Sequence, residues 1–200
     1  MAPTALDESP FLEAYARPPT RNSACTEYLA GSWFPRDAEA VSISLRYTFT
    51  CTPTSMQQAL RSPKVMRWVS APLVGYRSQE QGGFPDRWDE RPHRVTLLVL
   101  RTIPLGTQTI DLDWHVEGKT WVQEDHGSGL GGALKILHRI TVEPDDDGAT
   151  VFTDTLTTSG PLGALMQPVL WGLWQWRGVR LQQYARKLAR KFPATPLARR

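Results

Sequence analysis

The sequence predicts one α+β domain in which a curved antiparallel sheet of about seven strands surrounds a long C-terminal helix. Three observations lead to this prediction. An alternating strand occupies 41–51, and two short helical segments follow it directly. Further strand-like runs then come one after another, and a long amphipathic helix ends the chain. Strands joined in series pair antiparallel, and helices distributed in this way gather on one face of the sheet.

The first strand shows the clearest alternation of apolar and polar residues. Every second side chain of 41–51 lies on one face, and these are Val41, Ile43, Leu45, Tyr47, Phe49 and Cys51. A period of two predicts a half-buried strand. Thr52 and Pro53 then supply an N-cap and a first helical residue for a short helix over 53–60. A second short helix, over 63–69, also begins with proline.

Six further strands are predicted from β-branched and aromatic runs that turn residues separate. They lie at 73–78, 94–101, 108–117, 119–125, 134–142 and 150–158. A polar loop with glycine and proline connects the first two, over 79–93. Gly118 predicts a tight turn between the third and the fourth, and the acidic run at 144–148 predicts another before the last.

The last element is a long helix that begins near Pro161. Apolar and aromatic side chains recur there at three- and four-residue steps, so they share one stripe with Arg177. The members of the stripe are Leu170, Leu173, Leu181, Tyr184, Leu188 and Phe192. Pro168 lacks the N–H that a helix interior requires, so it kinks this helix or marks the start of its main part. Pro193 favours the end of the helix.

Length and composition are those of a globular protein with one core. The chain has 200 residues, of which 40% are hydrophobic and 22% charged. Residues 1–40 contain scattered prolines and predict an irregular leader, 41–192 form the predicted folded domain, and 193–200 form a basic tail. The longest uncharged stretch, 155–176, is too polar in its first half to span a bilayer. No transmembrane segment is therefore expected.

The cysteines and the N-terminus indicate a cytoplasmic protein. Cys25 and Cys51 are the only two cysteines, and their spacing predicts neither a disulfide framework nor a zinc site. A reducing compartment is the default for such a chain. The N-terminus carries acids and prolines where a secretory signal needs an apolar run, so export is not expected.

Charge is distributed unevenly along the chain. The net charge is +3, yet residues 177–200 carry eight basic residues and no acid. A basic tail is able to contact nucleic acid or anionic lipid, but a solvated helix face with a frayed end is the favoured interpretation. We expect no nucleic-acid partner. Peripheral contact with a membrane stays open.

Several patterns that resemble functional motifs have an unsuitable context. Residues 127–132 spell GxGxxG, but the run that follows alternates as a strand where a dinucleotide site needs a helix. A flexible loop is the better interpretation. Ser128 lacks the GxSxG motif and the histidine spacing of a nucleophile. One face of the strand at 108–117 carries Asp111, Asp113, His115 and Glu117. These are metal-ligand residue types, but a solvated outer surface is favoured. We expect neither a metal nor a cofactor.

The predicted arrangement of elements leaves space inside the domain. A sheet that curls around one amphipathic helix encloses a wedge, and side chains cannot fill a wide wedge completely. The sequence therefore predicts an internal pocket between the sheet and the C-terminal helix.

Three local patterns resemble those of a known superfamily. IPLGTQ at 103–108 is similar to its "PFG" turn, GATVFTD at 148–154 to its "GT-x-x-x-D" strand, and WQWRGVRL at 174–181 to its "F-x-x-R-H-x-x-L" helix. Together with the order of elements, they make residues 40–192 resemble a START-like domain of the polyketide cyclase/dehydrase and lipid-transport superfamily (SRPBCC). This resemblance implies the helix-grip fold and a cavity for lipids, polyketides, isoprenoids or aromatic compounds. Gly178 departs from the pattern, which has histidine or another polar residue there.

Three ionisable residues are candidate catalytic groups in such a pocket. His138 lies on the apolar face of its strand, where it is an acid, a base or a ligand anchor, or else a core histidine with a structural partner. Asp154 lies among Val, Phe and Thr, and Arg177 lies on the helix stripe. An ion pair of these two that orients helix on sheet is favoured. The alternative makes Arg177 a clamp for a ligand carboxylate, enolate or phenolate.

The predicted ligand-binding wall comes from inward registers of the strands and the helix. Its members are Leu112, Trp114, Ile136, His138, Leu170 and Trp174. The chain has eight tryptophans, and ordinary core packing accounts for most of them. Trp114 and Trp174 are the two that we expect to stack against a flat ligand.

The leading functional hypothesis is a module that binds or carries a hydrophobic small molecule for a biosynthetic pathway. The alternative is a polyketide cyclase, aromatase or dehydratase that uses the same pocket. His138 and Asp154 would then exchange protons, and Arg177 would stabilise an enolate. A membrane-peripheral lipid shuttle is a weaker alternative. The sequence leaves open whether the chain is an enzyme and what its oligomeric state is.

Overall fold

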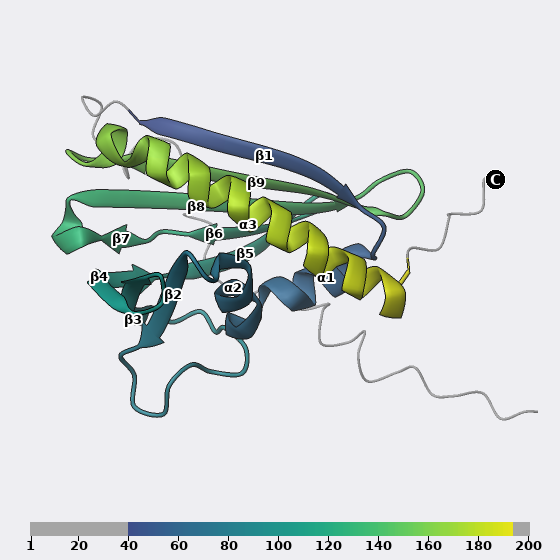
Figure 1. Ribbon diagram of the computed structural model, residues 1–200. Helices are drawn as coiled ribbons and strands as arrows, with labels where there is room; N and C mark the ends of the chain where they lie inside the picture. The colour runs from purple at the N-terminus through teal and green to yellow at the C-terminus, as the bar shows by residue number, and fades with distance from the viewer. Residues whose placement is uncertain (1–39, 194–200) are drawn as a thin grey trace, which may run out of the picture. The chain divides into compact units, whose positions relative to one another are not determined.

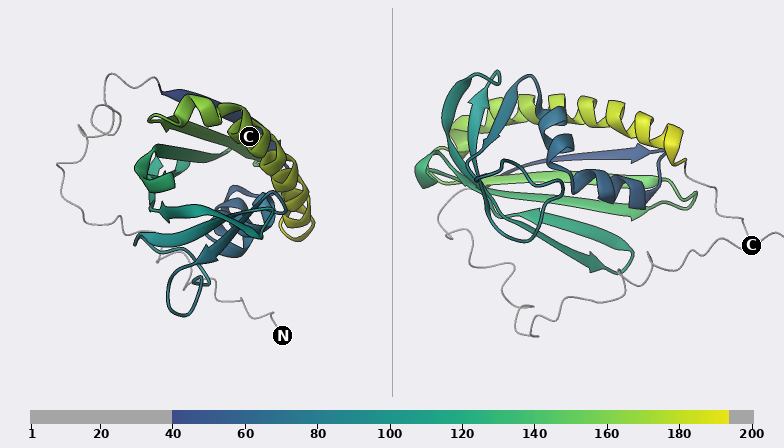
Figure 2. Two further views of the ribbon diagram at one scale, coloured as in Figure 1. Left: turned by 60° about the vertical axis from the view of Figure 1, so that its left-hand side comes forward. Right: turned by 90° about the horizontal axis from the view of Figure 1, so that it is seen from below.

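The computed structural model describes residues 40–193, which form one antiparallel sheet with three α-helices. The predicted leader at 1–40, except its last residue, and the predicted tail after Pro193 lie outside the described residues. The sheet curls around the long helix α3, as the views in Figures 1 and 2 show. The elements are β1 (Val41–Phe49), α1 (Pro53–Leu60), α2 (Pro63–Ser70), β2 (Val74–Ser78), β3 (His93–Val99), β4 (Ile103–Ile110), β5 (Leu112–Glu117), β6 (Thr120–Asp125), β7 (Ser128–Gly129), β8 (Leu134–Pro144), β9 (Thr150–Ser159) and α3 (Gly163–Lys191).

The first strand and the two short helices form where the sequence predicts them. Thr52 caps α1, because its side chain accepts a hydrogen bond from the Ser55 N–H at 3.3 Å. A proline at the first position of α1 and of α2 has no N–H to leave unpaired. The fold class predicted from the sequence, a curved antiparallel sheet around a C-terminal helix with two short helices after the first strand, is confirmed.

The sheet runs in the order β1-β9-β8-β7-β4-β3-β2. Strands β5 and β6 lie off this path, because β6 pairs with β8 and β5 pairs with β6. Strand β8 is long enough to pair with both β7 and β6 along one edge. The prediction of one strand over 108–117 is wrong, because the chain leaves the ladder at Asp111. There the Asp111 N–H donates to the Asp125 carboxylate at 2.9 Å, so a side chain replaces a neighbouring strand as acceptor. The predicted strand over 108–117 is therefore divided between β4 and β5.

The β3–β4 hairpin also differs from the prediction. Residues 103–108, expected as a turn, are extended and belong to β4. The register shifts between Leu97 and Leu98, which pair with Gly106 and Pro104, so Leu105 is an extra residue in a bulge. The turn itself lies at Leu100 and Arg101, which both have positive φ. Their left-handed backbone ends β3 two residues earlier than predicted.

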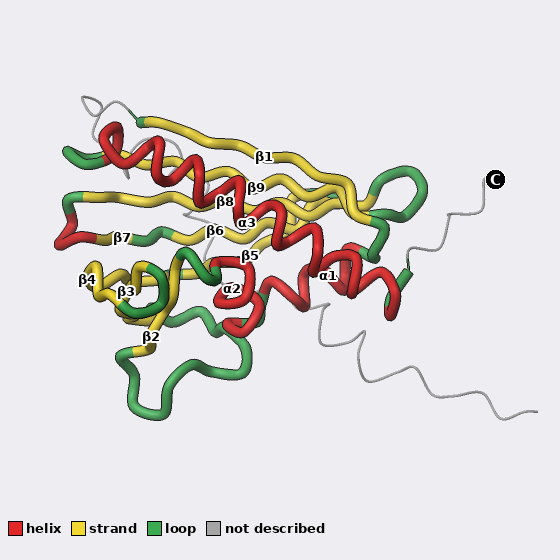
Figure 3. The backbone as a smooth tube through the Cα atoms, in the orientation of Figure 1, coloured by secondary structure: helices red, strands yellow, loops and turns green. Residues whose placement is uncertain are grey.

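Helix α3 contains Pro168 in its N-terminal part. It begins at Gly163, so Pro168 lies inside it and does not mark its start. The stripe faces the sheet, and Trp174, Leu181 and Ala185 are buried. Figure 3 shows the helix crossing the concave side of the strands, with α1 and α2 beside its C-terminal part. Within the described residues, no helix is long and apolar enough to cross a bilayer.

The core is divided between the two ends of α3. The larger cluster joins α1 and α2 to the sheet and to the C-terminal half of α3, and it contains Met56, Phe152 and Leu181. The smaller cluster consists of Ile43, Leu156 and Trp174 with their neighbours. The short helices fill the space only at the first end. The N-terminal half of α3 packs on the sheet through the smaller cluster, without α1 or α2 beside it.

Candidate functional site

A cavity of about 600 Å³ lies between the concave side of the sheet and α3. This volume falls within the range of small-molecule sites. Its wall is mainly aliphatic and aromatic, with contributions from α2, from most strands and from α3. The hairpin tip at Leu100 and the exposed side chain of Val169 on α3 both belong to the lining, so the cavity reaches the surface between them.

A polar cluster interrupts the apolar wall. The Nε2 atom of His138 on β8 lies 2.7 Å from Oδ1 of Asp154 on β9, and the indole N–H of Trp174 on α3 donates to the same oxygen at 2.9 Å. All three side chains are buried. Asp154 pairs with Ile140, two residues beyond His138, so the two side chains are diagonal neighbours on one face. The cluster therefore connects two strands to the helix across the cavity wall.

Asp154 is ionised within this cluster. Burial alone would raise the pKa of its carboxyl, but the charge and hydrogen bond of His138, the charge of Arg177 and the Trp174 N–H outweigh burial and lower it. The guanidinium of Arg177 stacks on the Trp174 ring, with its carbon 4.5 Å from the ring centre. The predicted direct ion pair of Arg177 with Asp154 does not form. The Trp174 ring is stacked beneath the guanidinium, and its N–H occupies Asp154 Oδ1 instead.

Gly178 has a structural explanation in this region. A β-carbon at this position would overlap the hydroxyl group of Tyr47 on β1, which packs directly against the helix backbone. Burial and the charge of Asp154 raise the pKa of Tyr47. The absence of a side chain at Gly178 thus lets α3 approach β1 next to the polar cluster.

A second carboxylate faces the cavity from β6. Asp125 pairs directly with His138 on β8, so the two side chains share one face. It is buried, and burial raises the pKa of its carboxyl to about 6, although the Asp111 N–H and two histidines oppose this. Gln108 and Gln123 also line the cavity. Sequence reasoning missed these three residues. The two-residue period of a strand puts Asp125 on the same face of β6 as the apolar Trp121, and this is the signal that would have placed it inward.

Solved structures share this arrangement. A protein of Chromobacterium violaceum aligns with a TM-score of 0.54 at 15% identity, over 72% of this chain and 96% of that one. Ara h 8.0201 aligns with a TM-score of 0.51 at 15% identity, over 74% and 99%. Norcoclaurine synthase from Thalictrum flavum aligns with a TM-score of 0.51 at 9% identity, over 76% and 96%. The chain has the START-like helix-grip fold. No protein-family model and no curated protein matches the sequence.

Most of the side chains predicted to bind a ligand line the helix-grip cavity. These are Leu112, Ile136, His138, Leu170 and Trp174, and the candidate catalytic residues Asp154 and Arg177 line it as well. Trp114 does not. It is buried in the larger core cluster, where its indole N–H donates to Gln123 Oε1 at 3.2 Å and Arg61 stacks on its ring at 4.8 Å. Its register is inward, but α1 covers that end of the sheet.

The glycine-rich segment at 127–132 also reaches the helix-grip cavity. It forms the short strand β7 and a single 3₁₀ turn over Leu130–Gly132, and β8 follows, so the order of a dinucleotide site is absent here. Gly129 and Leu130 belong to the cavity wall. The segment that was expected as a loop thus contributes a short strand and a 3₁₀ turn to the cavity wall.

On the acidic face of β5, the carboxylate of Glu117 already contacts Arg139 and His115. Arg139 donates to both carboxylate oxygens of Glu117, at 3.0 and 2.9 Å, and His115 Nε2 lies 2.9 Å from Glu117 Oε1. Across residues 40–193, no group of three or more His, Cys, Asp or Glu side chains has a geometry that could hold a metal ion.

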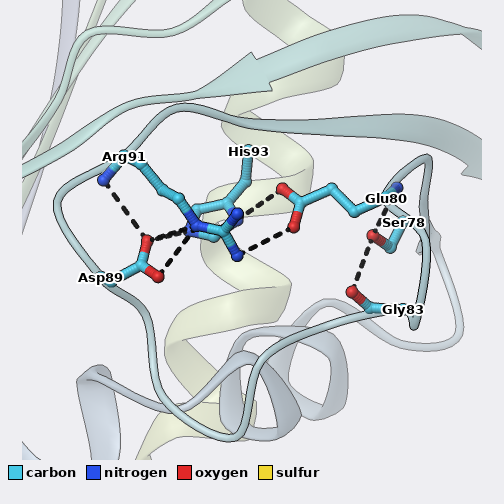
Figure 4. Close-up of polar contacts among 6 residues, drawn as sticks. All are labelled: Ser78, Glu80, Gly83, Asp89, Arg91 and His93. Atoms are coloured by element: carbon cyan, nitrogen blue, oxygen red, sulfur yellow. Dashed lines mark hydrogen bonds and ion pairs between the residues drawn. The ribbon is translucent and has the colours of Figure 1, made fainter.

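A further cluster of charged side chains connects the long loop between β2 and β3 to His93, the first residue of β3. Figure 4 shows His93 between two carboxylates, with Nδ1 2.7 Å from Glu80 Oε1 and Nε2 2.9 Å from Asp89 Oδ1. Arg91 donates to Glu80 at 3.2 Å. The same loop carries Trp88, whose ring lies 4.9 Å from that of His93 and which lines the cavity. This cluster therefore positions part of the cavity wall.

Proposed function

We propose that the protein binds a hydrophobic small molecule, such as a polyketide, isoprenoid, lipid or aromatic compound, and serves a biosynthetic pathway. The observation that carries the proposal is the apolar cavity of about 600 Å³ with a small polar cluster in its wall. Apolar walls supply affinity, and a few polar groups orient the ligand. Norcoclaurine synthase has the same fold, and its name describes an enzyme that produces a small molecule. A cytoplasmic location fits the free thiol of the buried Cys51.

The binding proposal predicts that filling the cavity removes binding. Leu170→Trp adds a large ring to the lining on α3, and we expect it to weaken binding of the fluorescent probe N-phenyl-1-naphthylamine by at least about tenfold. Titration of the probe measures this. Val179→Trp is the matched control, because Val179 is exposed on the same helix and is not among the lining residues. Equal probe affinity in both variants would exclude the cavity as the binding site.

The second candidate function is a polyketide cyclase, aromatase or dehydratase. The contact of His138 with Asp154 in the cavity wall favours it, since a carboxylate partner orients an imidazole toward the cavity. His138 would exchange protons with the ligand, Asp154 would position it, and Arg177 would stabilise an enolate.

Mass spectrometry of molecules that copurify with the protein separates the two functions. If the protein is a dehydratase, His138→Ala is expected to retain a molecule heavier than the one bound to the unmodified protein by the mass of one water. The control is Leu170→Trp, which is expected to retain neither molecule. An identical bound mass in the His138→Ala variant and the unmodified protein supports a carrier and contradicts the dehydratase.

A membrane-peripheral lipid shuttle is the third candidate. Exposed apolar side chains gather on the hairpin tip and on the first turns of α3, and they include Leu100, Ile103, Leu165, Val169 and Trp171. A bilayer surface would accommodate such side chains. The predicted basic tail lies beyond Pro193, outside the described residues.

A further inference from the structure

The cavity contains one permanently charged cation. Arg177 is the only arginine or lysine among the described residues that line the cavity. Its guanidinium lies against the Trp174 ring, and its buried Nε has no hydrogen-bond partner. Arginine remains protonated at any physiological pH. A buried donor without an acceptor is costly, so Nε of this cation lacks a partner that the protein could have supplied.

The carboxylates of the cavity do not provide that partner. Across residues 40–193, no carboxylate oxygen lies within 4.0 Å of an Arg177 nitrogen. Asp154 lowers the electrostatic cost, but its Oδ1 already accepts from Trp174 and contacts His138. Asp125 lies on β6, which is two strands away from Asp154 on β9, a separation of roughly 10 Å. A ligand anion beside Arg177 would therefore meet the guanidinium before it meets Asp125.

The lining residues on α3 also give the direction in which a ligand tail extends. Leu173, Leu170 and Met166 follow Arg177 toward the N-terminus of the helix at successive turns, and all belong to the lining. From Arg177 to Met166 the helix rises roughly 16 Å. This length suits an alkyl chain of about twelve carbons that points toward the opening near Val169.

We infer that the ligand is an amphiphilic carboxylic acid, whose carboxylate binds the Arg177 guanidinium and whose apolar tail follows α3 toward the cavity opening. This inference rests on the proposed binding function and specifies the chemical class of the ligand. A guanidinium binds a carboxylate through two parallel N–H donors, which also fixes the orientation of the molecule. Trp174 supports the guanidinium from one face and leaves its donor edge for the ligand.

Two probes that differ only at the head group test this inference. Dodecanoate and 1-dodecanol each displace N-phenyl-1-naphthylamine from the full-length protein at about pH 8, and the displacement gives their affinities. We expect dodecanoate to bind at least about tenfold more tightly, the ratio that one charge-assisted hydrogen bond supplies. In Arg177→Met the preference is expected to fall below about twofold, while the affinity for 1-dodecanol stays unchanged.

Two further variants complete the test. Arg180→Met is the matched control, because Arg180 lies on the same helix but stacks on Trp68 outside the cavity lining, and it is expected to keep the full preference. Arg177→Gln replaces Arg177→Met if loss of the stacking contact prevents folding, as judged by circular dichroism. Equal affinities of the unmodified protein for the two probes overturn the inference, and so does a preference that survives Arg177→Met or Arg177→Gln. Failure of every probe to bind would instead contradict the proposed binding function.

Discussion

Asp154→Ala is expected to lower the free energy of unfolding by about 3–5 kcal/mol, as measured by urea denaturation near neutral pH. The substitution removes the acceptor of the Trp174 indole and the carboxylate partner of His138, and both are buried. It also removes a negative charge that interacts electrostatically with Arg177. A buried polar group that loses its partner bears the full cost of its desolvation.

The pH dependence of this effect has a defined sign. The pKa of Asp154 in the folded protein is below its ordinary value of 3.8, so its stabilising contribution is present above pH 3.8. It is lost as the pH falls through the folded pKa, where the carboxyl becomes protonated in both states. The destabilisation by Asp154→Ala should therefore be largest near neutral pH and smaller in strong acid.

Asp154→Asn is the control for this experiment. Its side-chain oxygen still accepts from Trp174, so only the charge is lost, and we expect a smaller effect of about 1–2 kcal/mol. If Asp154→Ala lies within about 1 kcal/mol of the unmodified protein, the contacts of the cluster do not hold α3 on the sheet.

Asp125→Asn is expected to increase the free energy of unfolding by up to about 3 kcal/mol near pH 8 and to leave it nearly unchanged near pH 4. The folded pKa of about 6 lies above the ordinary value of 3.8. The contribution of Asp125 to stability is therefore fully present below pH 3.8 and is lost as the pH rises through about 6. Above that pH the folded protein contains a buried, ionised carboxylate, and asparagine removes this charge.

The asparagine keeps the local backbone contact of Asp125. Its side-chain oxygen still accepts from the Asp111 N–H, so the interruption between β4 and β5 is preserved. Urea denaturation at the two pH values measures the effect, and Asp113→Asn is the matched control. Asp113 is an exposed aspartate on β5, and we expect no stabilisation from its replacement. Equal stabilisation by Asp125→Asn at both pH values would show that the effect does not arise from the charge.

The order of elements was predictable because each element has its own local signal. The alternation of β1, the prolines that begin α1 and α2, and the spacing of apolar residues along α3 depend on residues near one another in the chain. The interruption between β4 and β5 was not predictable in the same way. The break at Asp111 exists because the Asp125 side chain accepts its N–H, and these residues are 14 positions apart in the chain.

The candidate site was predictable in part. The inward registers place His138, Asp154, Trp174 and Arg177 on faces that meet in the fold. The hydrogen-bond partners within the site depend on distances between side chains in the folded protein, and the spacing of residues in the sequence does not give these distances. The indole of Trp174 takes the position at Asp154 that Arg177 was expected to occupy. Trp114 has an inward register, yet its place along the sheet puts it in the core.

The amino-acid sequence by itself determined the succession of strands and helices, the apolar face of each one, and the existence of a wedge between sheet and helix. These properties follow from periodicity and from proline and glycine positions, which act over a few residues. Only the tertiary structure decided where the wedge stays hollow, because α1 and α2 pack against one end of α3 alone. It also decided which charges are left without a partner, since burial and pairing depend on contacts between residues far apart in the chain.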